Sequence, residues 1–216
     1  MSEITKKELV KLFSEGTSLS GMDLTGLNLS RTVLSGVDMT GADLRRCNLR
    51  GANLSGSNLN AVRLSESNLA EVNLRESDLT GSDLSDTYLM DSRLFGANFY
   101  GADLTGSNLS GAYMTGGVCL ERAALVGANL RGVDLTGGIL INADLTLALM
   151  RGINLTLSDM TGADLSGAIM NGANFTQANL SSARMRECKL SGSNFRGARL
   201  DNADLTDSDM GRWLFE

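Results

Sequence analysis

The sequence predicts an all-β solenoid, in which the chain winds around one axis and stacks copies of a short unit. Three observations support this prediction. A five-residue phrase recurs from about Thr17 to about Met210, as in GADLR at 41–45 and GADLT at 101–105, and a fixed short period means that one structural unit is copied and stacked. Aromatic residues make up only 5% of the chain, so no large core of bulky side chains is available. Pro is absent, so every repeat can donate its backbone N–H group to a ladder.

The first segment, residues 1–16, lies outside the repeat and is predicted to form a short α-helix that caps the solenoid. Thr5 and Glu8 fit a capping box, and Gly16 suits the end of a helix. A terminal coil would otherwise expose unpaired backbone groups and an apolar cross-section. The residues expected to form the apolar face of this cap are Ile4, Leu9, Leu12 and Phe13.

Residues 17–211 form the repeat region, in which a large apolar residue, the centre, recurs at every fifth position. The centres run from Leu19 to Met114, shift by one residue to Leu120, and continue to Met210. A small residue stands two positions before most centres, with Asp or Asn often between them. Residues two apart share one face of an extended segment, so the centre and the small residue are expected to point inward. The other residues turn a corner, which Gly, Asn and Asp tolerate best.

The single change of phase lies at residues 115–120, where one residue is inserted beside Gly116 and Gly117. Two glycines can absorb an extra residue as a bulge at a corner. Two interpretations are open at this point. The insertion is either a tolerated drift of the repeat, or a kink or interaction site near the middle of the rod.

The last segment, residues 212–216, is a short apolar tail that breaks the repeat. Its sequence is RWLFE. The side chains of Trp213, Leu214 and Phe215 could cover the last coil of their own chain, or they could meet a second copy end to end. Both arrangements would hide the open cross-section of the solenoid.

The repeated phrase A-(D/N)-L-x-x resembles the pentapeptide repeat family along about nine tenths of the chain. The resemblance implies a right-handed quadrilateral β-helix with four pentapeptides in each coil, and therefore about ten coils. Neighbouring coils would lie about 4.8 Å apart. Because family members often dimerise through this end, the resemblance also implies a homodimer that forms through Trp213, Leu214 and Phe215.

The composition argues against an enzyme. The chain contains no His, which is the commonest general base and metal ligand. It also lacks the patterns of a zinc cluster, a phosphate-binding loop or a nucleophile elbow. We therefore expect no catalytic residue, no metal and no cofactor. The three cysteines, Cys47, Cys119 and Cys188, are expected to be small apolar residues without a redox function.

The charge and the first residues bear on partners and location. The net charge is −6 and no basic face or tail is present, so direct nucleic-acid binding is not expected. The chain starts MSEITKKELV, which does not resemble a signal peptide, and no stretch approaches the length of a membrane span. These features predict a cytoplasmic protein that does not enter a membrane.

With four repeats per coil, every fourth repeat stacks on the same wall. We number the walls from the centres Leu19, Leu24, Leu29 and Leu34. On the second wall, the position before the centre is interrupted by two Arg and one Ala but is otherwise acidic. This acidic column consists of Asp23, Asp43, Asp83, Asp103, Asp144, Asp164 and Asp204. The same position on the third wall is mostly Asn, with Tyr88, Leu149 and Ile169 among the exceptions.

The acidic column has two interpretations. Asp can simply bond the backbone of the corner, as Asn does elsewhere. Alternatively, the column imitates duplex DNA. The chain resembles the pentapeptide repeat family, and several members of that family are thought to imitate DNA when they bind DNA gyrase or topoisomerase IV. Duplex DNA carries about one charge per 1.7 Å, whereas the column offers about one per 4.8 Å. We therefore expect a protein-interaction scaffold with an undefined partner; the alternative is a DNA-mimicking modulator of a type II topoisomerase.

Apolar side chains are also expected on the outer surface near the middle of the rod. A cluster of them can mark a partner surface, whereas scattered ones are ordinary. Because they fall on several walls, the sequence favours scatter. The residues are Tyr88, Met90, Phe95, Tyr100, Tyr113, Ile139, Ile141, Leu147, Leu149, Leu157 and Ile169.

Overall fold

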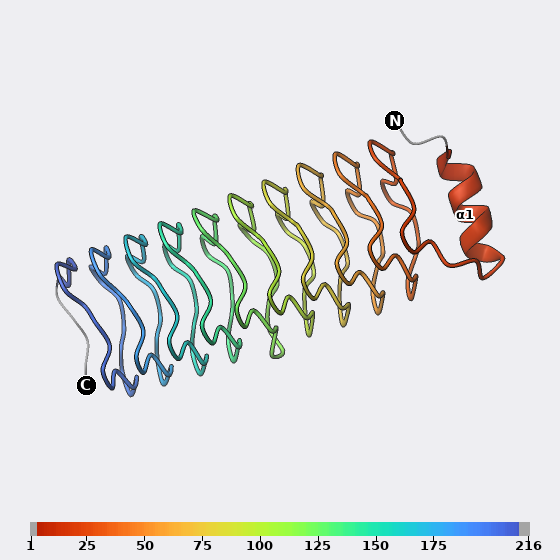
Figure 1. The fold of residues 1–216 in the computed structure, drawn as a ribbon. Coiled ribbons are helices and arrows are strands. Elements are labelled where there is room, and N and C mark those ends of the chain that lie inside the picture. The colour runs from red at the N-terminus through yellow and green to blue at the C-terminus, as the bar shows by residue number, and fades with distance from the viewer. Residues whose placement is uncertain (1–3, 212–216) are drawn as a thin grey trace.

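The computed structural model describes residues 4–211, which form a rod of stacked coils with an α-helix at one end (Figure 1). The helix α1 spans Lys6–Ser14 and is the only helix within the described residues. The rest of that range consists of turns and isolated β-bridges. The two described ends of the chain therefore lie at opposite ends of the rod.

Parallel β-bridges define the coil. Asp23 pairs with Asp43, Asn28 with Asn48, and the same twenty-residue step recurs on all four walls. Since each repeat has five residues, a coil contains four repeats, and the prediction of a solenoid is confirmed. The bridges join the residue before each centre, and the centres add further bonds, such as that from the N–H of Leu44 to the carbonyl of Arg63 at 2.7 Å.

The walls contain single-residue bridges rather than the continuous strands that the term β-helix suggests. Three residues of each repeat lie outside the turn, and only the middle one forms a bridge. A continuous strand needs several consecutive bridged residues, and strands usually have three or more. The hydrogen bonding therefore accumulates along the axis of the rod, from coil to coil, rather than along any one segment.

The interior is filled by the centres and the small residues. Centres such as Leu24, Leu104 and Leu109 are fully buried, and so are small residues such as Ala52. Identical side chains stack on successive coils, as the rings of Phe175 and Phe195 do at a centroid distance of 4.7 Å. Burying one side chain of this size stabilises a fold by about 1.5–3 kcal/mol. The core is thus a row of small, equivalent contributions.

Each corner is a tight turn that needs one left-handed residue. The N–H of the small residue donates to the carbonyl of the centre three positions earlier, as from Ala42 to Met39 at 2.9 Å. The second residue after the centre has a positive φ at every corner, which is the pattern of a type II turn. Gly fills many of these positions, but Leu147 and Leu157 both adopt a φ of 60° there.

The inserted residue is contained in one corner. Gly116 and Gly117 both have positive φ, and the ring of Phe95 covers Gly116 so closely that no Cβ fits there. The guanidinium of Arg75 lies 5.1 Å from the centre of the same ring. Bridges that cross the insertion step by twenty-one residues, as from Asn98 to Cys119, and then return to twenty. The insertion is therefore a corner bulge, and all four walls continue past it.

Helix α1 begins with a capping box and packs on the first coil. The N–H of Glu8 donates to Thr5 Oγ1 at 3.3 Å, and the N–H of Thr5 donates to Glu8 Oε2 at 2.8 Å. Leu9 is fully buried in the core, and three partly buried side chains, Ile4, Leu12 and Phe13, pack against it. At the other end, the tail residues Trp213, Leu214 and Phe215 lie outside the described residues.

Candidate interaction surface

The seven aspartates of the acidic column all bond the corner that follows them. In each case, Oδ1 accepts the backbone N–H of the residue two positions later, at 2.9–3.2 Å. These bonds fix the carboxylates at regular positions along one wall. The donors are Thr25, Arg45, Ser85, Thr105, Thr146, Ser166 and Thr206.

Asparagine forms the same corner bond on the other walls. The N–H of Ser55 donates to Asn53 Oδ1 at 3.2 Å on the fourth wall, and that of Arg131 donates to Asn129 Oδ1 at 3.3 Å on the third. The bond therefore does not require a charge. The structural interpretation explains why Asp or Asn stands at this position of the repeat, but it does not explain why the second wall uses Asp rather than Asn.

The hydrogen bonds favour the ionised form of several of these carboxylates. Bonds from the backbone and side chain of Thr25 lower the pKa of Asp23. For Asp83, burial raises the pKa, but hydrogen bonds from Ser85 outweigh it and the net shift is downward. Bonds from the side chain and backbone of Thr206, followed by one from Arg186, lower the pKa of Asp204 to about 2. These groups are therefore negative at neutral pH.

Arginines neutralise three aspartates of the column, Asp43 in its N-terminal part and Asp164 and Asp204 in its C-terminal part, whereas Asp23 forms no ion pair within residues 4–211. Asp43 is only 5% exposed and accepts ion pairs from Arg45 at 2.7 Å and Arg63 at 2.8 Å. Near the other end, Asp164 pairs with Arg184 at 3.4 Å, and Asp204 pairs with Arg186. Sequence reasoning missed these pairs, although Arg63 and Arg184 stand in the column itself and could have indicated them.

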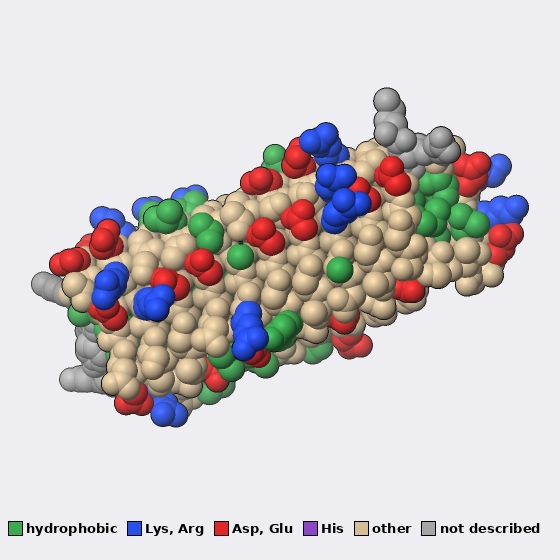
Figure 2. All heavy atoms as spheres, in the orientation of Figure 1, with side chains coloured by type: hydrophobic (Ala, Val, Ile, Leu, Met, Phe, Trp, Pro, Cys, Tyr) green, Lys and Arg blue, Asp and Glu red, His purple; other side chains and the backbone are tan. Residues whose placement is uncertain are grey.

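The middle of the column has no such neutralisation. Asp83, Asp103 and Asp144 form no ion pair with any residue in the range 4–211. Only Ala124 interrupts this stretch. Three of the column's four unpaired carboxylates therefore lie near mid-rod, the fourth being Asp23, and Figure 2 shows both acidic and basic side chains on the face in view.

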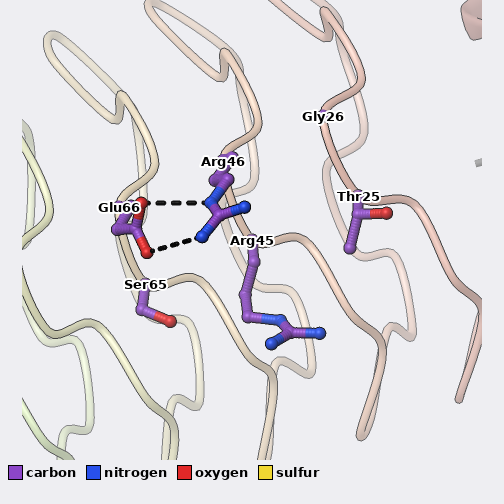
Figure 3. A pocket seen from close by; sticks show the side chains of 6 residues that line it. All are labelled: Thr25, Gly26, Arg45, Arg46, Ser65 and Glu66. Atoms are coloured by element: carbon purple, nitrogen blue, oxygen red, sulfur yellow. Dashed lines mark hydrogen bonds and ion pairs between the residues drawn. The ribbon is translucent and has the colours of Figure 1, made fainter. Parts of the chain in front are cut away.

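A shallow hollow of about 350 Å³ lies beside the N-terminal part of the column (Figure 3). Arg46 and Glu66 point toward one another there and form two bonds, at 3.0 and 3.2 Å. Arg45 is held by Asp43. The charged groups of the hollow thus satisfy one another, and its remaining lining consists of Thr25, Gly26 and Ser65.

Neither the buried thiols nor the acidic side chains form a reactive or metal-binding group among the described residues. Burial raises the pKa of the Cys47 and Cys188 thiols to about 11, so both stay protonated at neutral pH. Across the part of the chain that the structure describes, no three His, Cys, Asp or Glu side chains gather to hold a metal ion. A search of the same residues finds no helix of the length and apolarity that a bilayer span requires.

Comparison with solved structures gives two informative similarities. HetL, a pentapeptide repeat protein involved in heterocyst differentiation regulation from the cyanobacterium Nostoc sp. strain PCC 7120, is 29% identical, with a TM-score of 0.64 over 96% of this chain and 95% of HetL. A trypsin-treated form of QnrB1, a plasmid-mediated fluoroquinolone resistance protein, is 21% identical. Its TM-score is 0.51, and the match covers 85% of this chain and 88% of the QnrB1 chain. At that identity, the likeness to QnrB1 concerns the fold alone. Comparison with curated protein sequences returned no match.

The family model for pentapeptide repeats matches eight overlapping segments, which together span most of the chain. They are residues 15–51, 47–86, 57–94, 92–137, 117–156, 139–177, 158–197 and 178–212. The matched range contains the whole acidic column and the corner bulge. The resemblance inferred from the repeated phrase is confirmed, and the chain belongs to the pentapeptide repeat family.

Proposed function

We propose that this chain is a non-enzymatic scaffold that binds another protein through the outer surface of the rod. The observation that carries the proposal is the mid-rod stretch of the acidic column. Asp83, Asp103 and Asp144 are held in place by corner bonds and have no ion-pair partner among residues 4–211. Asn would preserve the same bonds, so the charge is available for a basic partner.

The alternative is a DNA-mimicking modulator of DNA gyrase or topoisomerase IV, of the type that gives resistance to quinolones or gyrase toxins. The acidic column supports it, and the likeness to QnrB1, a fluoroquinolone resistance protein, is compatible with it at the level of the fold. The charge density argues against it, because Asp43, Asp164 and Asp204 are neutralised by arginines. The scaffold function therefore remains the main proposal.

Capture from a bacterial lysate tests the scaffold function. The immobilised protein should retain a specific protein, identified by mass spectrometry, and the variant Asp83→Asn, Asp103→Asn, Asp144→Asn should retain less of it. A matched control removes three charges from the first wall, with Asp38→Asn, Asp78→Asn and Asp159→Asn. These aspartates form the same corner bonds, so both variants should fold equally well. Equal capture by both variants would refute the acidic column as the binding surface.

A supercoiling assay with purified gyrase tests the alternative. The wild-type protein at micromolar concentration should inhibit supercoiling, and the second-wall variant should inhibit less than the first-wall control. If the wild-type protein neither inhibits nor binds gyrase, the topoisomerase function is wrong. If both variants inhibit as the wild type does, gyrase is a partner but charge mimicry is not the mechanism.

We also propose the finer description of the fold: a right-handed quadrilateral β-helix of about ten coils, capped by α1. The buried Leu9 supports the cap. Leu205 and Met210 in the last coil are only partly buried, so they leave apolar surface that a cover at the C-terminal end would bury. We propose that a homodimer forms there through the tail. Trp213→Asp with Phe215→Asp should convert a dimer into a monomer in size-exclusion chromatography, and an unchanged elution volume of a dimeric parent would exclude this contact.

A further inference from the structure

The third wall carries an apolar strip in its C-terminal half, which we define as Leu147, Leu149 and Ile169. Leu149 and Ile169 are bridge partners on successive coils. Leu147 stands at the corner just before Leu149 and is 63% exposed. Its Cδ2 atom leans over Gly167 of the next coil, only 2.8 Å from where a Cβ on that glycine would lie. The three side chains thus occupy adjacent positions on two coils.

Each residue of the strip replaces one that would suit the local backbone better. On the same wall, Asn108 and Asn129 accept the N–H of the residue two positions later. Leu149 and Ile169 cannot form that bond. Leu147 has a φ of 60°, which bulky residues adopt rarely and which Gly adopts at the equivalent positions on both neighbouring coils. Three local losses within two coils indicate that the strip serves a purpose outside the fold.

Opposite charges flank the strip. On the coil of Leu149, Asp144 lies across the corner on the second wall and the exposed side chain of Arg151 lies on the corner toward the fourth wall. Arg131 occupies the same corner one coil earlier, and Asp103 lies on the second wall two coils earlier. None of these four groups has an ion-pair partner within residues 4–211. A partner that covers the strip should therefore carry basic residues on one side and acidic residues on the other.

The length of the surface suits a helix. Tyr88, 53% exposed, lies on the same wall, four bridge steps from Ile169 through Asn108 and Asn129. Four steps of about 4.8 Å make about 19 Å, which is about thirteen helical residues at 1.5 Å each. The amides of Asn108 and Asn129 bond one another at 3.1 Å, so they need no partner of their own. Tyr88 and Leu147 are the exposed large apolar residues of this surface, and Leu149 and Ile169 are half-buried. One helix can cover so narrow a surface, whereas a stable dimer interface uses about twenty to thirty residues of all kinds on each side.

We propose that this strip is the docking site for an amphipathic helix of a partner protein. The apolar stripe of the helix covers the strip, its Lys and Arg residues face Asp103 and Asp144, and its Asp and Glu residues face Arg131 and Arg151. The proposal rests on the proposed function as a protein-binding scaffold and names the surface and the partner chemistry that it would use.

A synthetic peptide tests the proposal. The probe is a fluorescein-labelled helix of eighteen residues, with one stripe of Leu flanked by Lys on one side and Glu on the other. Its fluorescence anisotropy is measured against the wild-type protein, Leu147→Asn and Leu157→Asn. Leu157 is the matched control, because it has the same φ of 60°, is 58% exposed, and lies on the corner after the fourth wall. Wild type and Leu157→Asn should bind alike, and Leu147→Asn at least tenfold more weakly.

Further measurements distinguish a partner helix from a second copy of the chain as the molecule that covers the strip. A scrambled peptide of the same composition should not bind, and Asp103→Asn with Asp144→Asn should weaken binding severalfold and reduce its dependence on salt. Equal binding by Leu147→Asn and Leu157→Asn, or no binding of the probe to the wild type, overturns the helix proposal. So does a dimer that Leu147→Asn dissociates, because a second copy would then cover the strip. If Leu147→Asn captures the same lysate proteins as the wild type, the scaffold function stands and this surface is refuted.

Discussion

The second and third walls have the same interior and the same corners but differ in the residue that faces outward. On the second wall, seven aspartates bond their corners and add a negative charge that the bond does not need. On the third wall, five asparagines form the same bond without charge. At Leu149 and Ile169 the third wall gives up the bond altogether. The comparison separates what the fold requires from what it merely permits.

This separation ranks the candidate surfaces. The acidic column is compatible with a purely structural function, because Asp satisfies the corner as well as Asn does. The apolar strip fits a purely structural function less well, because it combines an exposed Leu at a left-handed corner with two neighbouring positions, Leu149 and Ile169, that give up the corner bond. A residue that costs the fold something is better evidence of an external function than one that costs it nothing.

The largest expected effect tests whether the two walls are equal inside. Leu104→Ala on the second wall and Leu109→Ala on the third should each lower the free energy of unfolding by about 2–5 kcal/mol, since both side chains are fully buried. Urea unfolding followed by circular dichroism measures this. A clear inequality between the two variants would show that the walls differ in their packing as well as in their outer surfaces.

The next effect separates the corner bond from the charge. Asp103→Ala removes the acceptor for the N–H of Thr105 and should lower stability by about 1 kcal/mol. Asp103→Asn keeps an acceptor and should change stability by less than about 0.5 kcal/mol. The same urea experiment compares them. A large loss in Asp103→Asn would mean that the fold depends on the charge itself, contrary to the comparison of the walls.

A smaller effect of opposite sign is expected at the strip. Leu147→Asn should raise the free energy of unfolding by about 0.5–1 kcal/mol, because Asn tolerates the left-handed conformation better than Leu. Leu157→Asn should raise it by a similar amount. Differential scanning calorimetry of the two variants measures the gain. If Leu147→Asn instead destabilises the rod, the side chain contributes to folding, and the argument for an external function fails.

The smallest effect concerns pH. Since the pKa of Asp204 is about 2 in the fold and about 3.9 in an unfolded chain, the group stabilises the fold above about pH 4. That contribution is lost as pH falls from 4 toward 2. The difference in melting temperature between the wild type and Asp204→Asn should therefore be present at pH 5 and shrink toward pH 2. A difference that stays constant over this range would contradict the depressed pKa.

Much of this arrangement is readable from the repeat alone. The period identifies the buried centres, the left-handed corner positions and the column to which each outward residue belongs, because backbone geometry repeats with the sequence. The pairing of Arg46 with Glu66 was not predictable in this way, since long side chains on neighbouring coils can choose among several partners. The length of each bridged segment was also not predictable, because bridges that join residues twenty positions apart leave no local signal in the sequence.

The direction of the bonds between coils has a mechanical consequence. They run along the axis of the rod, so a force applied at its two ends would load them directly and open one coil at a time. Each opening releases twenty residues, about 66–72 Å of extended chain, in place of a single stacking step of about 4.8 Å. Under tension the rod would lengthen as a staircase of nearly equal steps, and the coil with the corner bulge, which holds one residue more, would give a step longer by one residue.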